Sequence, residues 1–198
     1  MLRLHHAPRS RSSRIVWLLQ ELGADCEIVY TNIPRMDGSG DEDPANPHPD
    51  KKVPALVHDG ALITESSAIV LYLTDLFPAA GLGPKPGDPK RGEYLTWLFY
   101  YAGVIEPVAT FEFAGLGENP ALIRTFRGRA ETDRRIMEAL RHGPYMLGET
   151  FSGIDILIAS MGQWARQMLP TGKVMDDYLA RCSARPALRA AFAKDSPG

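Results

Sequence analysis

The N-terminal part of the chain shows first the hydrophobic pattern of a strand, then that of a helix, and then that of a second strand. Residues 2–5 form a short strand candidate that Pro8 interrupts. Hydrophobic residues then recur with helical spacing up to Leu22, and Gly23 is a natural stop. Residues 27–31 alternate polar and apolar side chains, as a half-buried strand does. This strand–helix–strand order predicts a parallel pair with a right-handed crossover.

The next segment predicts a hairpin and a helix. Residues 34–50 are rich in proline, glycine and acidic residues, which indicates a long solvated loop, with room for one helical turn. Two apolar runs flank the dipeptide Asp59-Gly60, a strong hairpin signal because both turn positions need positive φ. A helix is expected from Glu65 to about Phe77, where Pro78 stops it. The order βαβ then ββα predicts one mixed four-stranded sheet.

The rest of the chain has the hydrophobic spacing of helices. Residues 80–89 are rich in glycine and proline and are expected to form a linker. Helices are predicted around residues 97–108, 122–140, 154–169, 175–182 and 187–193. We therefore expect an α/β domain at residues 1–79 and an all-helical domain at residues 90–198.

Composition and charge restrict the class of function. The chain of 198 residues has 44% hydrophobic and 23% charged residues and a net charge of −2, so a dedicated nucleic-acid binder is not expected. No apolar stretch is long enough to span a membrane, and the N-terminus lacks the apolar region of a secretory signal. The two cysteines and the five histidines have no metal-ligand spacing. A cytoplasmic protein without a metal is the expectation, and His6 is the one histidine expected near a site.

Three motifs carry a resemblance that covers nearly the whole chain. They are Lys52-Val53-Pro54-Ala55-Leu56, Glu65-Ser66-Ser67-Ala68-Ile69 and Phe151-Ser152-Gly153-Ile154-Asp155-Ile156. In this order, after an N-terminal strand and helix, they resemble the cytosolic glutathione S-transferase superfamily. The resemblance implies a thioredoxin-like domain that binds glutathione and a helical-bundle domain that contributes an electrophile pocket. In the third motif, Ser152 and Asp155 have the spacing of a capping box, so Asp155 is expected to be structural.

Glutathione carries two carboxylates, one ammonium and a thiol, and the second motif suits one end of it. Glu65 can pair with the ammonium, and Ser66 with the free N–H groups of a helix start can hold the γ-glutamyl carboxylate. The alternative is that Thr64 or Ser66 only caps the helix.

The first motif suits the middle and the glycyl end of the tripeptide. The resemblance implies a cis bond between Val53 and Pro54, with the Val53 backbone pairing with the cysteinyl backbone of glutathione. A proline that merely opens an edge strand is the alternative. Lys52 fits the position that contacts the glycyl end, unless it is a solvated surface residue; Lys51 is a weaker candidate.

The resemblance also implies a thiol-activating residue at the first strand–helix junction. The position of tyrosine in some classes holds His6, and the positions of cysteine in others hold Ala7 and Arg11. The serine position, as in the theta, delta and phi classes, holds Ser10. Ser10 is thus the candidate catalytic residue, with Ser12, Ser13 and His6 left open as the group that faces the thiol.

The activity implied by the resemblance is that of a glutathione S-transferase in detoxification. Glutathione would be the co-substrate, its thiolate would attack a small hydrophobic electrophile, and the chain would form a homodimer. Two alternatives remain open: a glutathione-dependent disulfide or peroxide reductase, isomerase or dehalogenase, and a non-enzymatic scaffold for protein contacts.

Overall fold

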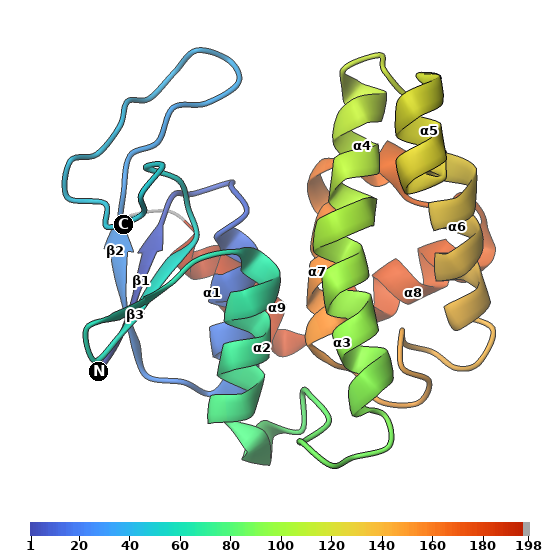
Figure 1. Ribbon diagram of the computed structural model, residues 1–198. Helices are drawn as coiled ribbons and strands as arrows, with labels where there is room; N and C mark the ends of the chain where they lie inside the picture. The colour runs from blue at the N-terminus through green and yellow to red at the C-terminus, as the bar shows by residue number, and fades with distance from the viewer. Residues whose placement is uncertain (196–198) are drawn as a thin grey trace. The chain divides into compact units, whose positions relative to one another are not determined.

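The computed structural model describes residues 1–195, and these divide into two compact units. The N-terminal unit comprises Met1–Ala80 together with residues 185–195, and the helical unit comprises Gly81–Ala184. Figure 1 shows the strands in the first unit and only helices in the second. The chain thus combines a thioredoxin-like domain with a helical region, as expected.

The N-terminal unit is built on a mixed sheet whose four strands have the order β2-β1-β3-β4. β1 (Leu2–His6) runs parallel to β2 (Cys26–Tyr30) and antiparallel to β3 (Ala55–His58). β3 pairs antiparallel with β4 (Ala61–Ile63). This topology confirms the predicted sheet.

The turns of this unit follow from its sequence. Asp59 and Gly60 join β3 and β4 with φ values of 47° and 88°, which confirms the predicted hairpin. Residues 31–54 contain only turns and bends, so the predicted loop is present without a helical turn.

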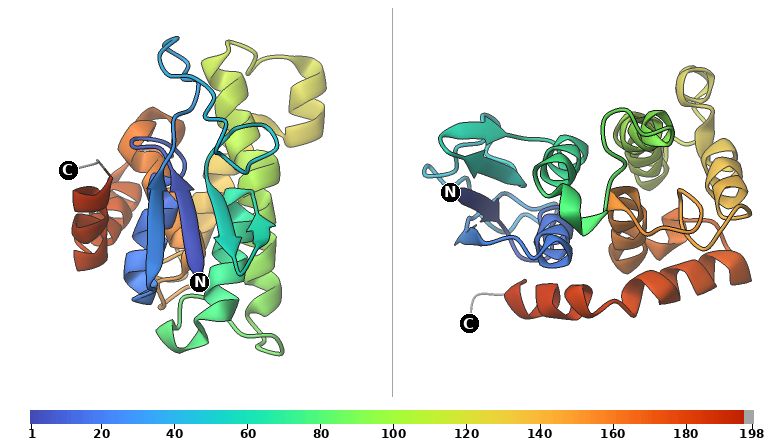
Figure 2. Two further views of the ribbon diagram at one scale, coloured as in Figure 1. Left: turned by 90° about the vertical axis from the view of Figure 1, so that its left-hand side faces the viewer. Right: turned by 90° about the horizontal axis from the view of Figure 1, so that it is seen from below.

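Two helices pack on the same face of the sheet, α1 (Ser13–Leu22) and α2 (Ser66–Leu76), as Figure 2 shows. The short η1 (Pro78–Ala80) follows α2. α1 ends at Gly23, whose φ of 60° is the left-handed conformation that closes many helices. The core between helices and sheet is apolar and includes Leu4, Leu56, Ile15, Leu18, Ile69 and Leu73.

The last helix differs from the expected domain division, because α9 (Pro186–Lys194) belongs to the N-terminal unit. It runs beside α1 (Figure 2) and buries Leu188 and Ala191. Arg185 closes the contact with two bonds to Glu21, Nε–Oε1 at 2.6 Å and Nη2–Oε2 at 2.7 Å. α9 therefore packs on α1 through apolar residues and through the arginine before its first turn. Helical periodicity alone does not predict which helix α9 contacts.

The helical unit contains helices that are interrupted or end at places where hydrophobic spacing predicted longer, continuous helices. Its elements are α3 (Arg91–Tyr100), the π-helix η2 (Tyr101–Ile105), α4 (Glu106–Phe113), α5 (Pro120–Phe126), α6 (Gly128–Ala139), α7 (Gly153–Trp164), η3 (Arg166–Met168) and α8 (Lys173–Ser183). The helix predicted at residues 122–140 breaks at Arg127, where φ is 67°. The helix predicted to reach residue 169 ends at Trp164.

The core of the helical unit is α7, which is buried from Gly153 to Met161. Ser152 and Asp155 form the predicted capping box at its start. The Asp155 carboxylate also accepts bonds from the Met146 N–H at 2.8 Å and the Tyr178 hydroxyl at 3.1 Å. Burial raises the pKa of Asp155 to about 6, against the effect of these donors. Asp155 therefore joins α7, α8 and the preceding loop, a structural role as expected.

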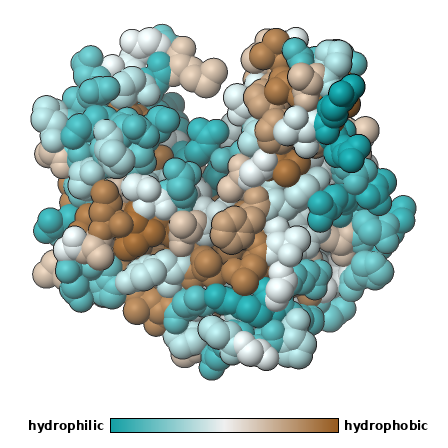
Figure 3. All heavy atoms as spheres, in the orientation of Figure 1, coloured by the Kyte–Doolittle hydropathy of each residue, from teal (hydrophilic) through white to brown (hydrophobic). Residues whose placement is uncertain are grey.

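Figure 3 shows both polar and hydrophobic side chains on the visible surface of the helical unit, with hydrophobic ones near the end of α4. Phe113 and Leu116 are about half exposed there, and the Phe113 ring stacks on Trp164 with centroids 6.5 Å apart. Among residues 1–195, no helix is both long and apolar enough to cross a bilayer.

Candidate functional site

Three chain junctions that carry the candidate residues meet at one edge of the sheet. The register pairs His5 of β1 with Ala55 of β3, and Leu56 of β3 with Ile63 of β4. Extending the pairing of β1 with β3 by one residue places Pro54 beside His6. Extending the pairing of β3 with β4 by two residues places Pro54 beside Glu65. The junction after β1, the start of β3 and the start of α2 therefore lie together, although they are far apart in sequence.

The junction between β1 and α1 holds three serines in different environments. Ser12 is buried, and its hydroxyl oxygen accepts the Ala7 N–H at 3.1 Å. The Ser13 hydroxyl donates to the carboxylate of Asp195. Ser10 is only half-buried, and its hydroxyl donates to the Ala7 carbonyl at 2.7 Å or to Ser12 Oγ at 2.7 Å. Ser10 and Ser13 are both half-buried, and Ser10 is the one of the two whose hydroxyl is not bound to the carboxylate of Asp195.

The backbone of this junction is held from several sides. Arg9 has a φ of 53°, which turns the chain sharply before Ser10. The Arg35 guanidinium donates to the Pro8 carbonyl at 2.9 Å and ties the loop after β2 to the junction. The Ser12 N–H donates to Ser10 Oγ at 3.1 Å, so the Ser10 hydroxyl accepts one bond and donates its own proton to the Ala7 carbonyl or to Ser12 Oγ.

The Val53–Pro54 bond is cis, as the resemblance implied. Both residues are buried at the start of β3. The loop before them is fixed by Asn46, whose amide donates to the Lys52 carbonyl at 3.0 Å. Lys51 directs its ammonium inwards to the Asn46 carbonyl at 2.8 Å, whereas Lys52 is exposed. Of the two lysines, Lys52 is the exposed one, so its ammonium is better placed to contact the carboxylate of a ligand.

The start of α2 holds Glu65 and Ser66 as the sequence predicted. Glu65 takes a φ of 67° before the first helical residue, and its side chain is exposed. Ser66 is buried, and neither residue caps the helix with its side chain. The first N–H groups of α2 are therefore not occupied by a side-chain cap, which keeps the positive end of the helix open to an anion.

The structure adds a residue that sequence reasoning missed, Asp195, just after α9. Its carboxylate lies 3.3 Å from His6 Nε2 and accepts the Arg9 N–H at 3.1 Å. Burial opposes ionisation of Asp195, but the contacts with His6, Ser13 and the Arg9 N–H hold its pKa below the ordinary value. No local pattern could have signalled this pairing, because it depends on the docking of α9 against α1.

His6 was expected as a group near the site, and the structure buries it completely. Its Nδ1 atom lies 2.7 Å from Ser12 Oγ. The ring lies 5.8 Å from that of Tyr30, centroid to centroid. Because the side chain has no exposed surface, His6 can act on a ligand only through its neighbours.

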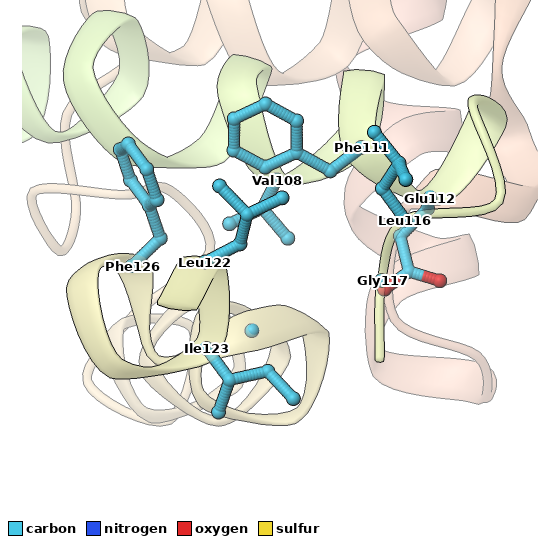
Figure 4. Close-up of a pocket in the computed structure, with 9 residues that line it drawn as sticks. Val108, Phe111, Glu112, Leu116, Gly117, Leu122, Ile123 and Phe126 are labelled. Atoms are coloured by element: carbon cyan, nitrogen blue, oxygen red, sulfur yellow. The ribbon is translucent and has the colours of Figure 1, made fainter. Parts of the chain in front are cut away.

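Some aromatic residues of the helical unit pack in its core, and others, such as Phe99, Phe113 and Trp164, are exposed. Tyr94, Trp97 and Tyr101 are buried. Arg135 lies over the Tyr100 ring at 3.8 Å from its centroid, and burial raises the pKa of Tyr100. A small hollow lies between α4 and α5 (Figure 4), and its hydrophobic lining is Val108, Phe111, Leu116, Leu122, Ile123 and Phe126.

A metal centre is not evident in the described part of the chain. Across residues 1–195, no three histidine, cysteine, aspartate or glutamate side chains gather closely enough to hold a metal ion. The groups that the candidate site offers are hydroxyls, backbone N–H groups, carboxylates and the lysine and arginine side chains around it.

Comparison with known proteins shows what the chain is similar to. Residues 4–85 match the family described as glutathione S-transferase, N-terminal domain. The chain is 36% identical over 91 residues to protein LigF of a Sphingobium species, a match over 46% of this chain and 35% of LigF. It is 35% identical over 111 residues to glutathione S-transferase 3 of Schizosaccharomyces pombe, a match over 54% of this chain and 43% of that relative. The matches thus span less than half the length of these two curated relatives.

A solved structure resembles the whole chain. A sphingomonad glutathione S-transferase, solved in complex with glutathione, superposes with a TM-score of 0.77 at 26% identity and covers 98% of each chain. Taken together, the comparisons support the glutathione S-transferase superfamily for this chain.

Proposed function

We propose that this chain is a glutathione transferase in which Ser10 stabilises the thiolate of bound glutathione for attack on a hydrophobic electrophile. The observation that carries the proposal is the meeting, at one sheet edge, of a half-buried serine, a buried cis-proline and an uncapped helix start. These groups match the thiol, the backbone and the γ-glutamyl end of one tripeptide.

Each part of glutathione has a partner in this arrangement. Glu65 receives the ammonium, while Ser66 and the first N–H groups of α2 receive the γ-glutamyl carboxylate. The Val53 backbone pairs with the cysteinyl backbone, as an added strand pairs with a sheet edge. Lys52 receives the glycyl carboxylate. The sulfur then lies near the junction that holds Ser10, which is the serine-type site of the theta, delta and phi classes.

The energy required of Ser10 is modest. Lowering a thiol pKa by two units takes about 2.7 kcal/mol, at about 1.36 kcal/mol per unit. A hydrogen bond to a charged group contributes roughly 1.5–3 kcal/mol, and a helix N-terminus adds roughly 0.3–1 kcal/mol. The positive charges of Arg9 and Arg11, both exposed beside Ser10, act in the same direction. A hydroxyl donor is therefore sufficient, and no general base is needed.

The competing activities have less support. A reductase, isomerase or dehalogenase would use the same bound thiolate, and a non-enzymatic scaffold would not need it. Glutathione S-transferase 3 of Schizosaccharomyces pombe is among the relatives, and its name favours transfer of glutathione. A homodimer, a hydrophobic electrophile, a role in detoxification and a cytoplasmic location complete the proposal, and sedimentation of the purified chain tests the dimer.

The test is a titration of the bound thiol. The ultraviolet absorbance of the thiolate, followed against pH with glutathione bound, gives the thiol pKa in the wild type and in Ser10→Ala. We expect the variant to raise that pKa by about one to two units, since it removes a hydrogen bond to a charged group. The matched control is Ser39→Ala in the exposed loop, which should leave the pKa unchanged. An unchanged pKa in Ser10→Ala would show that another group activates the thiol.

A further inference from the structure

The peptide group between Pro8 and Arg9, just before Ser10, has both of its polar atoms held by side chains that are distant in sequence. Its carbonyl oxygen accepts a hydrogen bond from the Arg35 guanidinium at 2.9 Å. Its N–H donates to Oδ2 of Asp195, just after α9, at 3.1 Å. The loop after β2 and the end of the last helix therefore fix the orientation of this one peptide group together.

The Asp195 carboxylate holds the next peptide group as well, through Ser13. The Ser13 hydroxyl donates to Asp195 Oδ1, and Ser13 Oγ accepts the Ser10 N–H at 3.3 Å. One carboxylate thus reaches the backbone N–H of Arg9 directly and that of Ser10 through a single hydroxyl. His6 Nε2 lies 3.3 Å from the same carboxylate, but neither of these hydrogen bonds requires a charge on that ring.

The junction needs such support because its backbone conformation is unfavourable in itself. Arg9 has a φ of 53°, in the left-handed region, where residues other than glycine are strained. Conformations of this kind persist where the surrounding structure holds them. The Arg9 side chain is exposed, so its packing contributes little to the turn. The hydrogen bonds to the two peptide groups are therefore the main support of this conformation.

The end of α9 is well anchored for this purpose. At its start, Arg185 pairs with Glu21 of α1 through two short bonds. At its end, the Tyr30 hydroxyl of β2 donates to the Lys194 carbonyl at 3.0 Å. α9 is thus attached at both ends to other elements of the N-terminal unit, and the Asp195 carboxylate that follows it has a defined position.

We propose that Asp195 is a positioning residue for glutathione binding, which holds the Arg9 and Ser10 peptide groups in the conformation that receives the tripeptide. It acts in the ligand-free protein, because a junction that is already ordered does not have to be ordered by the ligand. Asp195 has this role only if glutathione binds at the junction, as proposed above, whichever group donates to its sulfur. The C-terminal helix then helps to shape the site.

The charge of Asp195 and its hydrogen bonds should act on binding in opposite directions. Glutathione carries a net negative charge, so a carboxylate beside its site repels it, and removal of that charge alone should strengthen binding. Removal of the hydrogen bonds should weaken binding, because only the molecules with an ordered junction are competent to bind. The two effects therefore differ in sign.

The experiment compares Asp195→Ala, which removes the hydrogen bonds and the charge, with Asp195→Asn, which removes only the charge. The asparagine amide offers its oxygen to the Arg9 N–H and its own N–H to Ser13 Oγ. We expect Asp195→Ala to raise the dissociation constant of glutathione, measured by calorimetry, roughly three- to tenfold. Asp195→Asn should bind glutathione at least as tightly as the wild type, within about twofold.

A second measurement needs no ligand. Hydrogen exchange of the Arg9 amide, followed by NMR in the free protein, reports directly on its bond to Asp195. It should be at least about threefold faster in Asp195→Ala, whereas Asp195→Asn should retain the protection. At saturating glutathione the kcat of Asp195→Ala should stay within about twofold of the wild type, because the bound tripeptide then holds the junction.

The matched control is Asp88→Ala. Asp88 also accepts a backbone N–H, that of Lys90 at 2.8 Å, but it is exposed and lies in the helical unit. This variant should change neither the affinity for glutathione nor the exchange of the Arg9 amide. Urea unfolding of each variant confirms that the N-terminal unit is folded in the binding experiment.

The outcomes separate the role of Asp195 from the proposed function. An unchanged affinity in Asp195→Ala would show that Asp195 does not position the junction, even if Ser10→Ala raises the thiol pKa as proposed. Equal weakening by Asp195→Ala and Asp195→Asn would also overturn it, because the charge and not the hydrogen bonds would then matter. If Ser10→Ala leaves the thiol pKa unchanged while Asp195→Ala alone weakens binding, the role of Ser10 is wrong and that of Asp195 stands. If the wild type does not bind glutathione, both are wrong.

Discussion

The guanidinium of Arg185 and the carboxylate of Glu21 form a two-point pair that joins the start of α9 to α1, with N–O distances of 2.6 and 2.7 Å. Glu21 also accepts the Trp17 indole N–H at 2.9 Å. The pair lies within the N-terminal unit and fixes the helix whose end carries Asp195. It therefore links the stability of this unit to the geometry of the candidate site.

Loss of this pair should weaken the docking of α9. We expect Arg185→Met to lower the free energy of unfolding by about 1–3 kcal/mol, because the Glu21 side chain, only 6% exposed, loses its charged partner. Urea unfolding measures the change. The matched control is Arg134→Met, whose pair with Glu131 is exposed, and it should stay within about 0.5 kcal/mol of the wild type. Equal losses in the two variants would show that the Arg185 pair has no special structural role.

Glu65 should act on binding more than on turnover. We expect Glu65→Gln to raise the KM for glutathione roughly tenfold or more, since a hydrogen bond to a charged group is worth roughly 1.5–3 kcal/mol. The kcat should change little, because the ammonium is held alike in the ground state and the transition state. Steady-state kinetics with an aryl halide provide the measurement. The control is Glu149→Gln, which changes an exposed glutamate. If the KM of Glu65→Gln were as low as that of the control, Glu65 would not bind glutathione.

Asp155 should be required for stability, and its contribution should depend on pH. We expect Asp155→Asn to lower the free energy of unfolding by roughly 2–4 kcal/mol, since the buried donors that now share its two oxygens lose an acceptor. The pKa of Asp155 is about 6 in the fold and 3.8 ordinarily, so the native state binds the proton more tightly. This contribution is complete below about pH 4 and is lost as the pH rises through about 6.

The pH dependence gives a second measurement on the same variant. The difference in unfolding free energy between the wild type and Asp155→Asn should be larger at about pH 4.5 than at about pH 7, by at most about 3 kcal/mol. Urea unfolding at the two pH values measures it. A difference that grows with pH would mean that Asp155 is stabilised as the carboxylate and that its pKa is lowered.

The hairpin turn offers a test of backbone conformation. Gly60 has a φ of 88° with no atom within 4 Å of an added Cβ, and Gly92 in α3 has the same open space with helical backbone. We expect Gly60→Ala to cost about 1 kcal/mol, because an L-residue is strained at that φ. Gly92→Ala should instead stabilise by about 0.5–1 kcal/mol through helix propensity. Thermal unfolding compares the pair, and losses in both would point to contacts rather than conformation.

The sequence by itself determined the local elements and the parts of the site that are local. Alternating residues in β1 and β2, the Asp59-Gly60 turn and the Ser152–Asp155 capping box each specify their structure through neighbours a few residues away. The same holds for Glu65 and Ser66 at the start of α2 and for Pro54 at the start of β3. Their roles with glutathione stay predictions.

Tertiary structure decided which distant residues meet. The break at Arg127 and the π-helix over residues 101–105 depend on how the helical unit packs, and hydrophobic period alone predicted longer helices. Likewise, a single aspartate after the last helix has no local signature. Asp195 reaches His6 only because α9 packs on α1, and a contact between the two ends of a chain is set by the burial of whole helices rather than by the residues beside it.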